Sequence, residues 1–198
     1  MVLELLVIFL YNSEMIEIKI LTRFDPARFD QLSSGYTSTE KFVVSKSESS
    51  DDTTISIQRR RLELPYIKKW DPDPDLQTHY TEIIQQGHSL GLYAGEELVG
   101  IAIAEKRDWN SQLWVWEFHI APDYRGQGHG RHLMNALAEI GKRADCRALV
   151  CETQNTNAPA IDFYRRVGFE IGAVDLSYYT NQDPEEFEVA LFMKRYLE

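Results

Sequence analysis

The segment His119–Arg131 constrains the fold of this chain more than any other part of the sequence. It reads His-Ile-Ala-Pro-Asp-Tyr-Arg-Gly-Gln-Gly-His-Gly-Arg. An apolar stretch with strand character, Trp114–Ile120, leads into it, and Leu133, Leu137 and Ile140 recur at helical spacing after it. The segment therefore predicts a strand, a glycine-rich loop and an amphipathic helix in direct succession.

The loop fits the pattern Arg-x-x-Gly-x-Gly, beginning at Arg125. Its glycines, Gly126, Gly128 and Gly130, let the backbone adopt unusual dihedral angles and approach a ligand closely. Successive N–H groups at the start of a helix form an anion site suited to a pyrophosphate. The alternative is a turn that only connects strand to helix. A nicotinamide site is disfavoured, because its glycine motif would follow the first strand of a βαβ unit. Here the loop lies past the middle of the chain, after strands that pair as a hairpin.

Two motifs in this order carry a resemblance to a known family. The loop resembles the acetyl-CoA-binding motif of the GNAT family of N-acetyltransferases, and Asn157–Phe169 is similar to the second cofactor element of that family. The resemblance covers about residues 88–198. Three further stretches, Glu152–Asn157, Ile171–Asp175 and the pair Tyr178-Tyr179, are similar to the streptothricin acetyltransferase branch, which acetylates an amine of a cationic antibiotic.

The resemblance implies an α/β acyl-CoA N-acyltransferase fold, with a mixed central sheet flanked by helices. We expect a single N-acetyltransferase domain over residues 15–198, because Met15 begins the alternating run Ile16–Ile20. Residues 1–14 are a possible N-terminal extension. Their apolar stretch lacks the charged start and the cleavage site of a signal peptide, and it is too short to span a bilayer.

Acetyl-CoA is the co-substrate that the resemblance implies, and no metal is expected. Backbone groups of His119 and Ile120 would pair with the pantetheine arm and polarise the thioester carbonyl. Tyr164 matches the general acid of the family, which protonates the departing thiolate. The alternative is a core tyrosine on an amphipathic helix, and capping of the start of that helix is the alternative role of Asn157. The residues that this reading assigns to the cofactor are His119, Ile120, Arg125, Gly126, Gln127, Gly128, His129, Gly130, Arg131, Asn157 and Tyr164.

The general base is less sharply indicated by the resemblance. Many relatives carry a glutamate in the strand before the loop, and counting back from Ile120 places Trp116 at that position. Glu117 and Glu152 are the candidates. Because side chains alternate faces along a strand, Glu117 can also point away from the cleft, and a surface carboxylate is the alternative for both glutamates.

A cationic acceptor fits the composition. The formal net charge of −10 at pH 7 argues against a nucleic-acid partner and would attract cationic amines, and the alternative is that most of these carboxylates only keep the protein soluble. Glu152, Asp175, Tyr178 and Tyr179 would offer carboxylates and aromatic faces to such a substrate. The sequence predicts acetyl transfer to a primary amine of a small cationic molecule by direct attack, with a streptothricin-like antibiotic favoured. A protein or peptide N-acetyltransferase and a non-catalytic CoA-binding module are the alternatives.

The remaining expectations concern the setting of the protein. Cys146 and Cys151 form no disulfide framework or zinc motif, and Cys151 is expected to be a buried thiol. A cytoplasmic monomer or homodimer without a membrane partner is expected. Trp109, Trp114 and Trp116 either line the cleft or belong to the core. The pattern predicts strands over 15–22, 53–64, 89–94, 98–105, 112–120, 147–152, 169–179 and 187–196, helices over 25–32, 76–86, from the loop to 143 and from 157 to 168, and a loop over 45–54.

Overall fold

The structure is a computed structural model that describes residues 7–11, 14–69, 74–183 and 188–198 of the chain. The chain divides into two compact units. Unit 1 contains residues 1–34, 70–150 and 196–198, and unit 2 contains residues 35–69 and 151–195.

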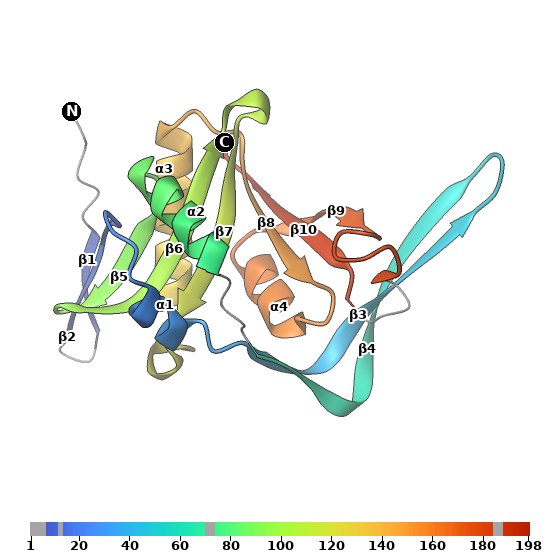
Figure 1. The fold of residues 1–198 in the computed structure, drawn as a ribbon, viewed down its shortest axis with the longest axis horizontal. Coiled ribbons are helices and arrows are strands. Elements are labelled where there is room, and N and C mark those ends of the chain that lie inside the picture. Colours follow the sequence, from blue (N-terminus) through green and yellow to red (C-terminus); the bar gives the residue numbers. More distant parts are fainter. Residues whose placement is uncertain (1–6, 12–13, 70–73, 184–187) are drawn as a thin grey trace. The chain divides into compact units, whose positions relative to one another are not determined.

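Unit 1 is built on antiparallel strands in the order β1-β2-β5-β6-β7, and the first residues of β8 follow β7 (Figure 1). The strands are β1 (Val7–Tyr11), β2 (Glu14–Ile20), β5 (Leu90–Ala94), β6 (Glu97–Arg107), β7 (Gln112–Ile120) and β8 (Ala148–Gln154). The predicted hairpin between residues 89 and 105 is confirmed as β5 and β6, and the predicted strand 112–120 is β7. Within the possible N-terminal extension, Val7–Tyr11 forms a strand that pairs with β2.

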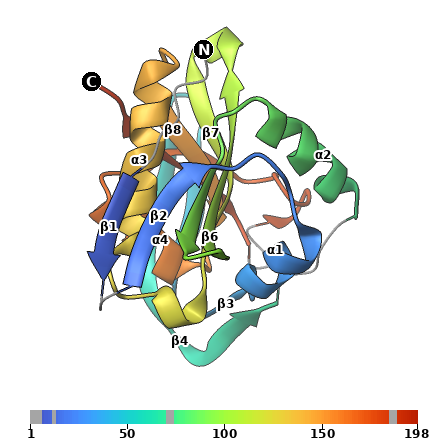
Figure 2. The ribbon, with the colours of Figure 1, turned by 90° about the vertical axis from the view of Figure 1, so that its left-hand side faces the viewer.

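Three helices flank this part of the sheet. Helices α1 (Pro26–Leu32) and α2 (Pro74–Gln85) lie on one face, and α3 (His129–Arg143) lies on the other (Figure 2). Helix α1 begins where the sequence predicts it, because the Asp25 carboxylate accepts a hydrogen bond from the Arg28 backbone N–H at 3.2 Å and Pro26 fits the first turn. Between α1, α2 and β6 lies a hydrophobic core formed by Leu21, Phe24, Phe29, Leu32, Tyr80, Ile83, Ile84, Ile101 and Ile103.

Unit 2 contains the end of β8, helix α4 (Ala158–Arg166), strands β9 (Glu170–Asp175) and β10 (Ala190–Tyr196), and a long antiparallel ribbon. The ribbon consists of β3 (Tyr36–Glu48) and β4 (Thr53–Lys68), and its distal end extends away from α4 (Figure 1). The predicted loop over 45–54 is therefore wrong. Only residues 49–52 connect the two strands. Up to this connection β3 and β4 pair through polar residues such as Ser45 and Ser56, whose hydroxyl oxygens are 3.1 Å apart.

Asn155 joins the ribbon to the rest of unit 2. Its side-chain amide donates to the Phe42 carbonyl oxygen at 2.8 Å, and its side-chain carbonyl accepts from the Val189 N–H at 2.8 Å. Its own backbone N–H and carbonyl bond to the same two residues. Asn155 is buried, so these bonds fix the middle of β3 against the rest of unit 2.

The last strands differ from the prediction at their ends. Strand β9 ends at Asp175, so Tyr178 and Tyr179 lie in a bend instead of a strand. Strand β10 confirms the last predicted strand from Ala190 onward, and residue 187 lies outside the described residues. Among the described residues, no helix has the length and apolar character that crossing a membrane requires.

Candidate active site

The glycine loop lies in unit 1 and leaves the start of α3 open. Gly128 is the residue before the helix and has a φ of +89°, and Gly126 has a φ of +75°. The N-cap residue Gly128 makes no side-chain capping bond, and a Cβ added to either glycine would meet no atom within 4 Å. The first N–H groups of a helix have no acceptor within it. The loop therefore presents backbone donors to an open side, as an anion site requires.

The side chains of the loop hold its shape. The Arg125 Nε–H donates to the Ile120 carbonyl oxygen at 2.7 Å, and the Gln127 amide donates to the Asp123 carbonyl oxygen at 2.6 Å. His129 is buried, and its Nε2 lies 3.2 Å from Oε1 of Gln127. Burial lowers the pKa of the His129 imidazole. Arg125, Gln127 and His129 therefore act on the loop itself, whereas Arg131 is exposed.

A β-bulge in β7 changes how Glu117 must be interpreted. Ile103 of β6 pairs with Glu117 and Ala104 pairs with Val115, so Trp116 is an extra residue without a partner in β6. Trp116 packs against the core cluster that contains Tyr80, and Glu117 accepts a hydrogen bond from the Tyr80 hydroxyl. A bulge breaks the alternation of faces. Both consecutive side chains consequently lie on the α1–α2 side of the sheet.

Glu117 belongs to a buried polar group in unit 1. Besides the Tyr80 hydroxyl, Nε2 of His119 lies 2.6 Å from the second oxygen of its carboxylate. The His119 ring packs edge-on against Phe29 of α1, with 5.5 Å between ring centroids. Glu117 is only 7% exposed. The alternative of a surface carboxylate is therefore wrong for Glu117, and the carboxylate is oriented by two donors.

The three candidate tryptophans lie in different surroundings. Trp114 is buried under the Arg107 guanidinium, which lies 3.7 Å from the centroid of its ring. The Trp116 indole N–H donates to Glu105 at 2.9 Å. Trp109 is 84% exposed in a short 3-10 turn. Of the three, only Trp114 belongs to the buried core.

Helix α4 in unit 2 carries the second motif. The Asn157 side chain accepts from the Ala160 N–H at 3.2 Å, so Asn157 caps α4 as the sequence predicts. Tyr164 is buried, with its ring centroid 5.4 Å from that of Phe169. Burial raises the pKa of the Cys151 thiol, and a hydrogen bond with Tyr164 partly opposes that rise. The predicted buried thiol at Cys151 is confirmed.

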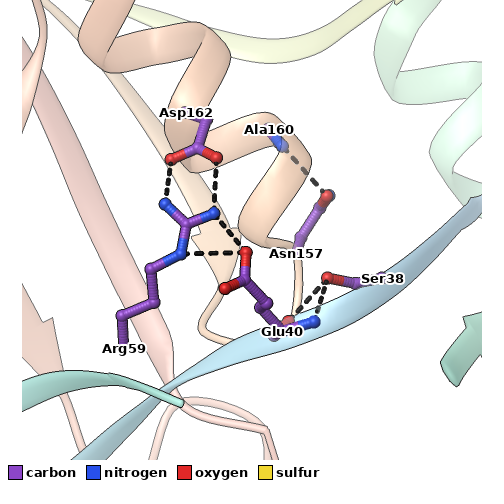
Figure 3. Close-up of polar contacts among 6 residues, drawn as sticks. All are labelled: Ser38, Glu40, Arg59, Asn157, Ala160 and Asp162. Atoms are coloured by element: carbon purple, nitrogen blue, oxygen red, sulfur yellow. Dashed lines mark hydrogen bonds and ion pairs between the residues drawn. The ribbon is translucent and has the colours of Figure 1, made fainter. Parts of the chain in front are cut away.

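A charge clamp ties α4 to the ribbon within unit 2 (Figure 3). The Arg59 guanidinium of β4 donates two hydrogen bonds to the Asp162 carboxylate of α4, each at 2.9 Å, and its Nε–H donates to Glu40 of β3 at 3.0 Å. This bidentate geometry is the one that a guanidinium and a carboxylate prefer. Asp162 lies between Asn157 and Tyr164 in the sequence, so the clamp helps to orient the helix that carries both.

Only some of the residues predicted to bind the acceptor contact one another. The Tyr179 hydroxyl donates to the Glu152 carboxylate, which joins two of them. Tyr178 packs edge-on against Tyr179, with ring centroids 5.3 Å apart. Asp175 instead accepts from the Ser177 N–H at 3.0 Å and so stabilises a turn.

Sequence reasoning missed the other polar side chains near Glu152. Lys68 forms an ion pair with Glu188 at 2.6 Å and lies 6.0 Å from the Tyr179 ring centroid. The hydroxyl of Tyr66 donates to the same glutamate at 2.9 Å. Tyr66 and Lys68 lie on β4, far in the sequence from Glu152 and from Glu188, and no local motif links them. Within the described ranges, no group of three or more His, Cys, Asp or Glu side chains is arranged to hold a metal ion.

Comparison with known proteins adds independent evidence. The model of the Acetyltransferase (GNAT) family matches residues 55–169. The chain is 33% identical to streptothricin acetyltransferase A of Bacillus subtilis (strain 168) over 132 residues, which cover 67% of this chain and 74% of that protein. It is 37% identical to a streptothricin acetyltransferase of Streptomyces lavendulae over 104 residues, which cover 52% of this chain and about half, 54%, of that protein.

Solved structures show the same fold. A nourseothricin acetyltransferase superposes with a TM-score of 0.67 at 25% identity, covering 92% of this chain and 99% of its own. A putative streptothricin acetyltransferase from Bacillus anthracis str. Ames, solved in complex with acetyl coenzyme A, superposes with a TM-score of 0.70 at 20% identity, covering 92% and 98%. The predicted α/β acyltransferase fold is thereby confirmed.

Proposed function

The chain belongs to the acetyltransferase (GNAT) family, and from this premise we propose that it moves an acetyl group from acetyl-CoA to a primary amine of a small cationic molecule. We favour a streptothricin-like antibiotic as the acceptor. The observation that carries the proposal is the similarity to streptothricin acetyltransferases over about two thirds of the chain. The formal charge of −10 also favours encounter with a cation.

The residues of the glycine loop fit acetyl-CoA. The N-cap residue Gly128 makes no side-chain capping bond, and the Cβ positions of Gly126 and Gly128 face open space, so this start of a helix has room for a pyrophosphate. The backbone of His119 and Ile120 would hold the pantetheine amides. When bound, acetyl-CoA would supply the thioester whose carbonyl carbon the amine attacks.

The chain's own residues would move two protons. Amines are mostly protonated at neutral pH, so a base must first remove a proton from the acceptor. We assign this role to Glu117, whose carboxylate is fixed by the Tyr80 hydroxyl and the His119 ring. We assign to the Tyr164 hydroxyl the donation of a proton to the departing sulfur, and the second proton that the nitrogen loses as the amide forms would return to the tyrosinate through solvent. Glu152, held by Tyr179, would then serve acceptor binding, with a role as base as the alternative.

A protein N-terminus is the second candidate acceptor. The chain is 30% identical to a putative [ribosomal protein bS18]-alanine N-acetyltransferase of Bacillus subtilis (strain 168) over 129 residues, which cover 65% of this chain and 71% of that protein. The name of that relative gives an alanine of a ribosomal protein as its acceptor. A non-catalytic CoA-binding module is disfavoured, because the glycine loop, Glu117 and Tyr164 are all present.

Thiol release tests the proposal. The protein is mixed with acetyl-CoA and a chromogenic disulfide, and streptothricin, spermidine, an aminoglycoside and a peptide with an N-terminal alanine are compared as acceptors. We expect release with streptothricin at a rate well above that of the other acceptors. Release with the peptide alone would favour the second candidate, and acetyl-CoA binding without release for any amine would contradict an enzymatic role.

A further inference from the structure

A polar cluster in unit 2 holds an ammonium group that belongs to the protein itself. One oxygen of the Glu188 carboxylate accepts from the Tyr66 hydroxyl at 2.9 Å and from the Thr156 hydroxyl at 3.4 Å. The other oxygen contacts Nζ of Lys68 at 2.6 Å. Neutral donors thus fix the carboxylate on one side, while the other side faces a cation.

The cluster carries more negative than positive charge. Glu152 and Glu188 are the carboxylates, and Lys68 is the cation that pairs with Glu188. The tyrosines do not add charge, because burial and the adjacent Glu188 raise the pKa of Tyr66 to about 12, and burial together with the Glu152 charge also raises the pKa of Tyr179. One excess negative charge and neutral aromatic groups are chemistry suited to a further ammonium group.

The backbone of Lys68 is fixed independently of the ion pair that its side chain makes with Glu188. It ends β4 and pairs with Tyr36 at the start of β3. Its carbonyl oxygen passes so close to Gly35 that a Cβ there would lie 2.0 Å away, and Gly35 has a φ of +77°, so no other residue fits easily. The Lys68 side chain is 36% exposed and has a flexible four-carbon stem. The ammonium can therefore leave Glu188 while the strand stays in place.

We propose that Lys68 occupies, in the free protein, the subsite in which Glu188 receives a second ammonium group of the acceptor, and that the acceptor displaces Lys68 from it. This inference rests on the proposed function, because it requires a cationic amine as the acceptor. The occupant is an amine that carries a protonated nitrogen besides the one that is acetylated. Lys68 then acts as an internal competitor that screens against acceptors with a single charge.

The test compares Lys68→Met with a matched control. Methionine keeps most of the apolar stem and removes the charge. Lys46→Met is the control, because it removes the same charge from the same ribbon and breaks a comparable ion pair with Glu48. Streptothricin, cadaverine and pentylamine are titrated calorimetrically into each variant without acetyl-CoA, and thiol release is then measured with acetyl-CoA.

We expect Lys68→Met to bind streptothricin and cadaverine about threefold or more tighter, since an internal like charge no longer competes. Pentylamine should not change, and Lys46→Met should behave as the unmodified protein. Glu188→Gln should weaken streptothricin binding by about tenfold. Lys68→Met binding equal to that of Lys46→Met, or no diamine binding at all, would overturn the inference. Tighter binding without thiol release in any variant would instead contradict the proposed function alone.

Discussion

Replacing Glu117 by glutamine separates its chemical role from its role in packing. The Glu117 carboxylate is 7% exposed and takes two hydrogen bonds, from the Tyr80 hydroxyl and from His119. Glutamine has the same shape but no charge. Hydrogen bonds to charged groups contribute about 1.5–3 kcal/mol and neutral ones about 0.5–1.5 kcal/mol, so the two bonds together lose roughly 2 kcal/mol of unfolding free energy.

A loss of this size leaves a typical domain folded, because domains have about 5–15 kcal/mol of stability. The turnover rate should fall much more than this loss of folding stability can explain. Loss of a general base commonly lowers turnover by about 10²-fold or more. We therefore expect Glu117→Gln to lower kcat by at least that factor, while acetyl-CoA binding stays within about twofold, since the substitution leaves the loop N–H groups in place.

The assay is thiol release at saturating acetyl-CoA, with urea unfolding and cofactor titration on the same preparations. Glu105→Gln is the matched control, because Glu105 also accepts from an aromatic donor, the Trp116 indole, on the neighbouring strand. Its kcat should stay within about threefold of the unmodified protein, far from the loss expected for a general base. A kcat for Glu117→Gln that matches this control would refute the assignment of Glu117 as the base.

Three further predictions concern the cofactor motifs. Tyr164→Phe should lower kcat by about tenfold or more with acetyl-CoA binding retained in calorimetry, because only the acidic hydroxyl is lost; an unchanged kcat would exclude the acid role. Gly128→Ala should lower both the unfolding free energy, by roughly 1–2 kcal/mol at its positive φ, and the affinity for acetyl-CoA, whereas Gly95→Ala, at a φ of +59° and equally open, should lower stability alone; equal cofactor affinities would contradict a role for the loop. Burial lowers the pKa of His129, so the folded protein holds this side chain neutral more strongly than the unfolded chain does. The unfolding free energy is therefore highest above the ordinary histidine pKa of 6.5 and decreases as the pH falls below it. The urea midpoint should drop on acidification through this range, less steeply in His129→Gln, and identical profiles would refute the burial argument.

Local signals in the sequence predict the elements that bear the cofactor motifs. Helical spacing after Gly128 predicts α3, and the capping chemistry of Asn157 predicts the start of α4. Both depend on residues a few positions apart. The long ribbon is less visible, because no residue of β4 is buried and that strand is held by pairing with β3.

Two features of the candidate site lie beyond local patterns. The bulge at Trp116 shifts the register by one residue, so a count along the strand cannot tell which side Glu117 faces. Glu188 meets Tyr66 and Lys68 only because the ribbon folds back to the end of the chain. Such contacts are set by tertiary packing, and no residue close to Glu188 in the sequence marks it as part of a site.

The central claim is that this chain acetylates an amine of a small cation. Mass spectrometry of streptothricin after incubation with the protein and acetyl-CoA tests it most directly, with the site of modification located by fragmentation. The account predicts a product heavier by one acetyl group on an amine, formed in equal amount to the CoA released. Unmodified streptothricin alongside acetyl-CoA that is bound but not consumed would contradict it.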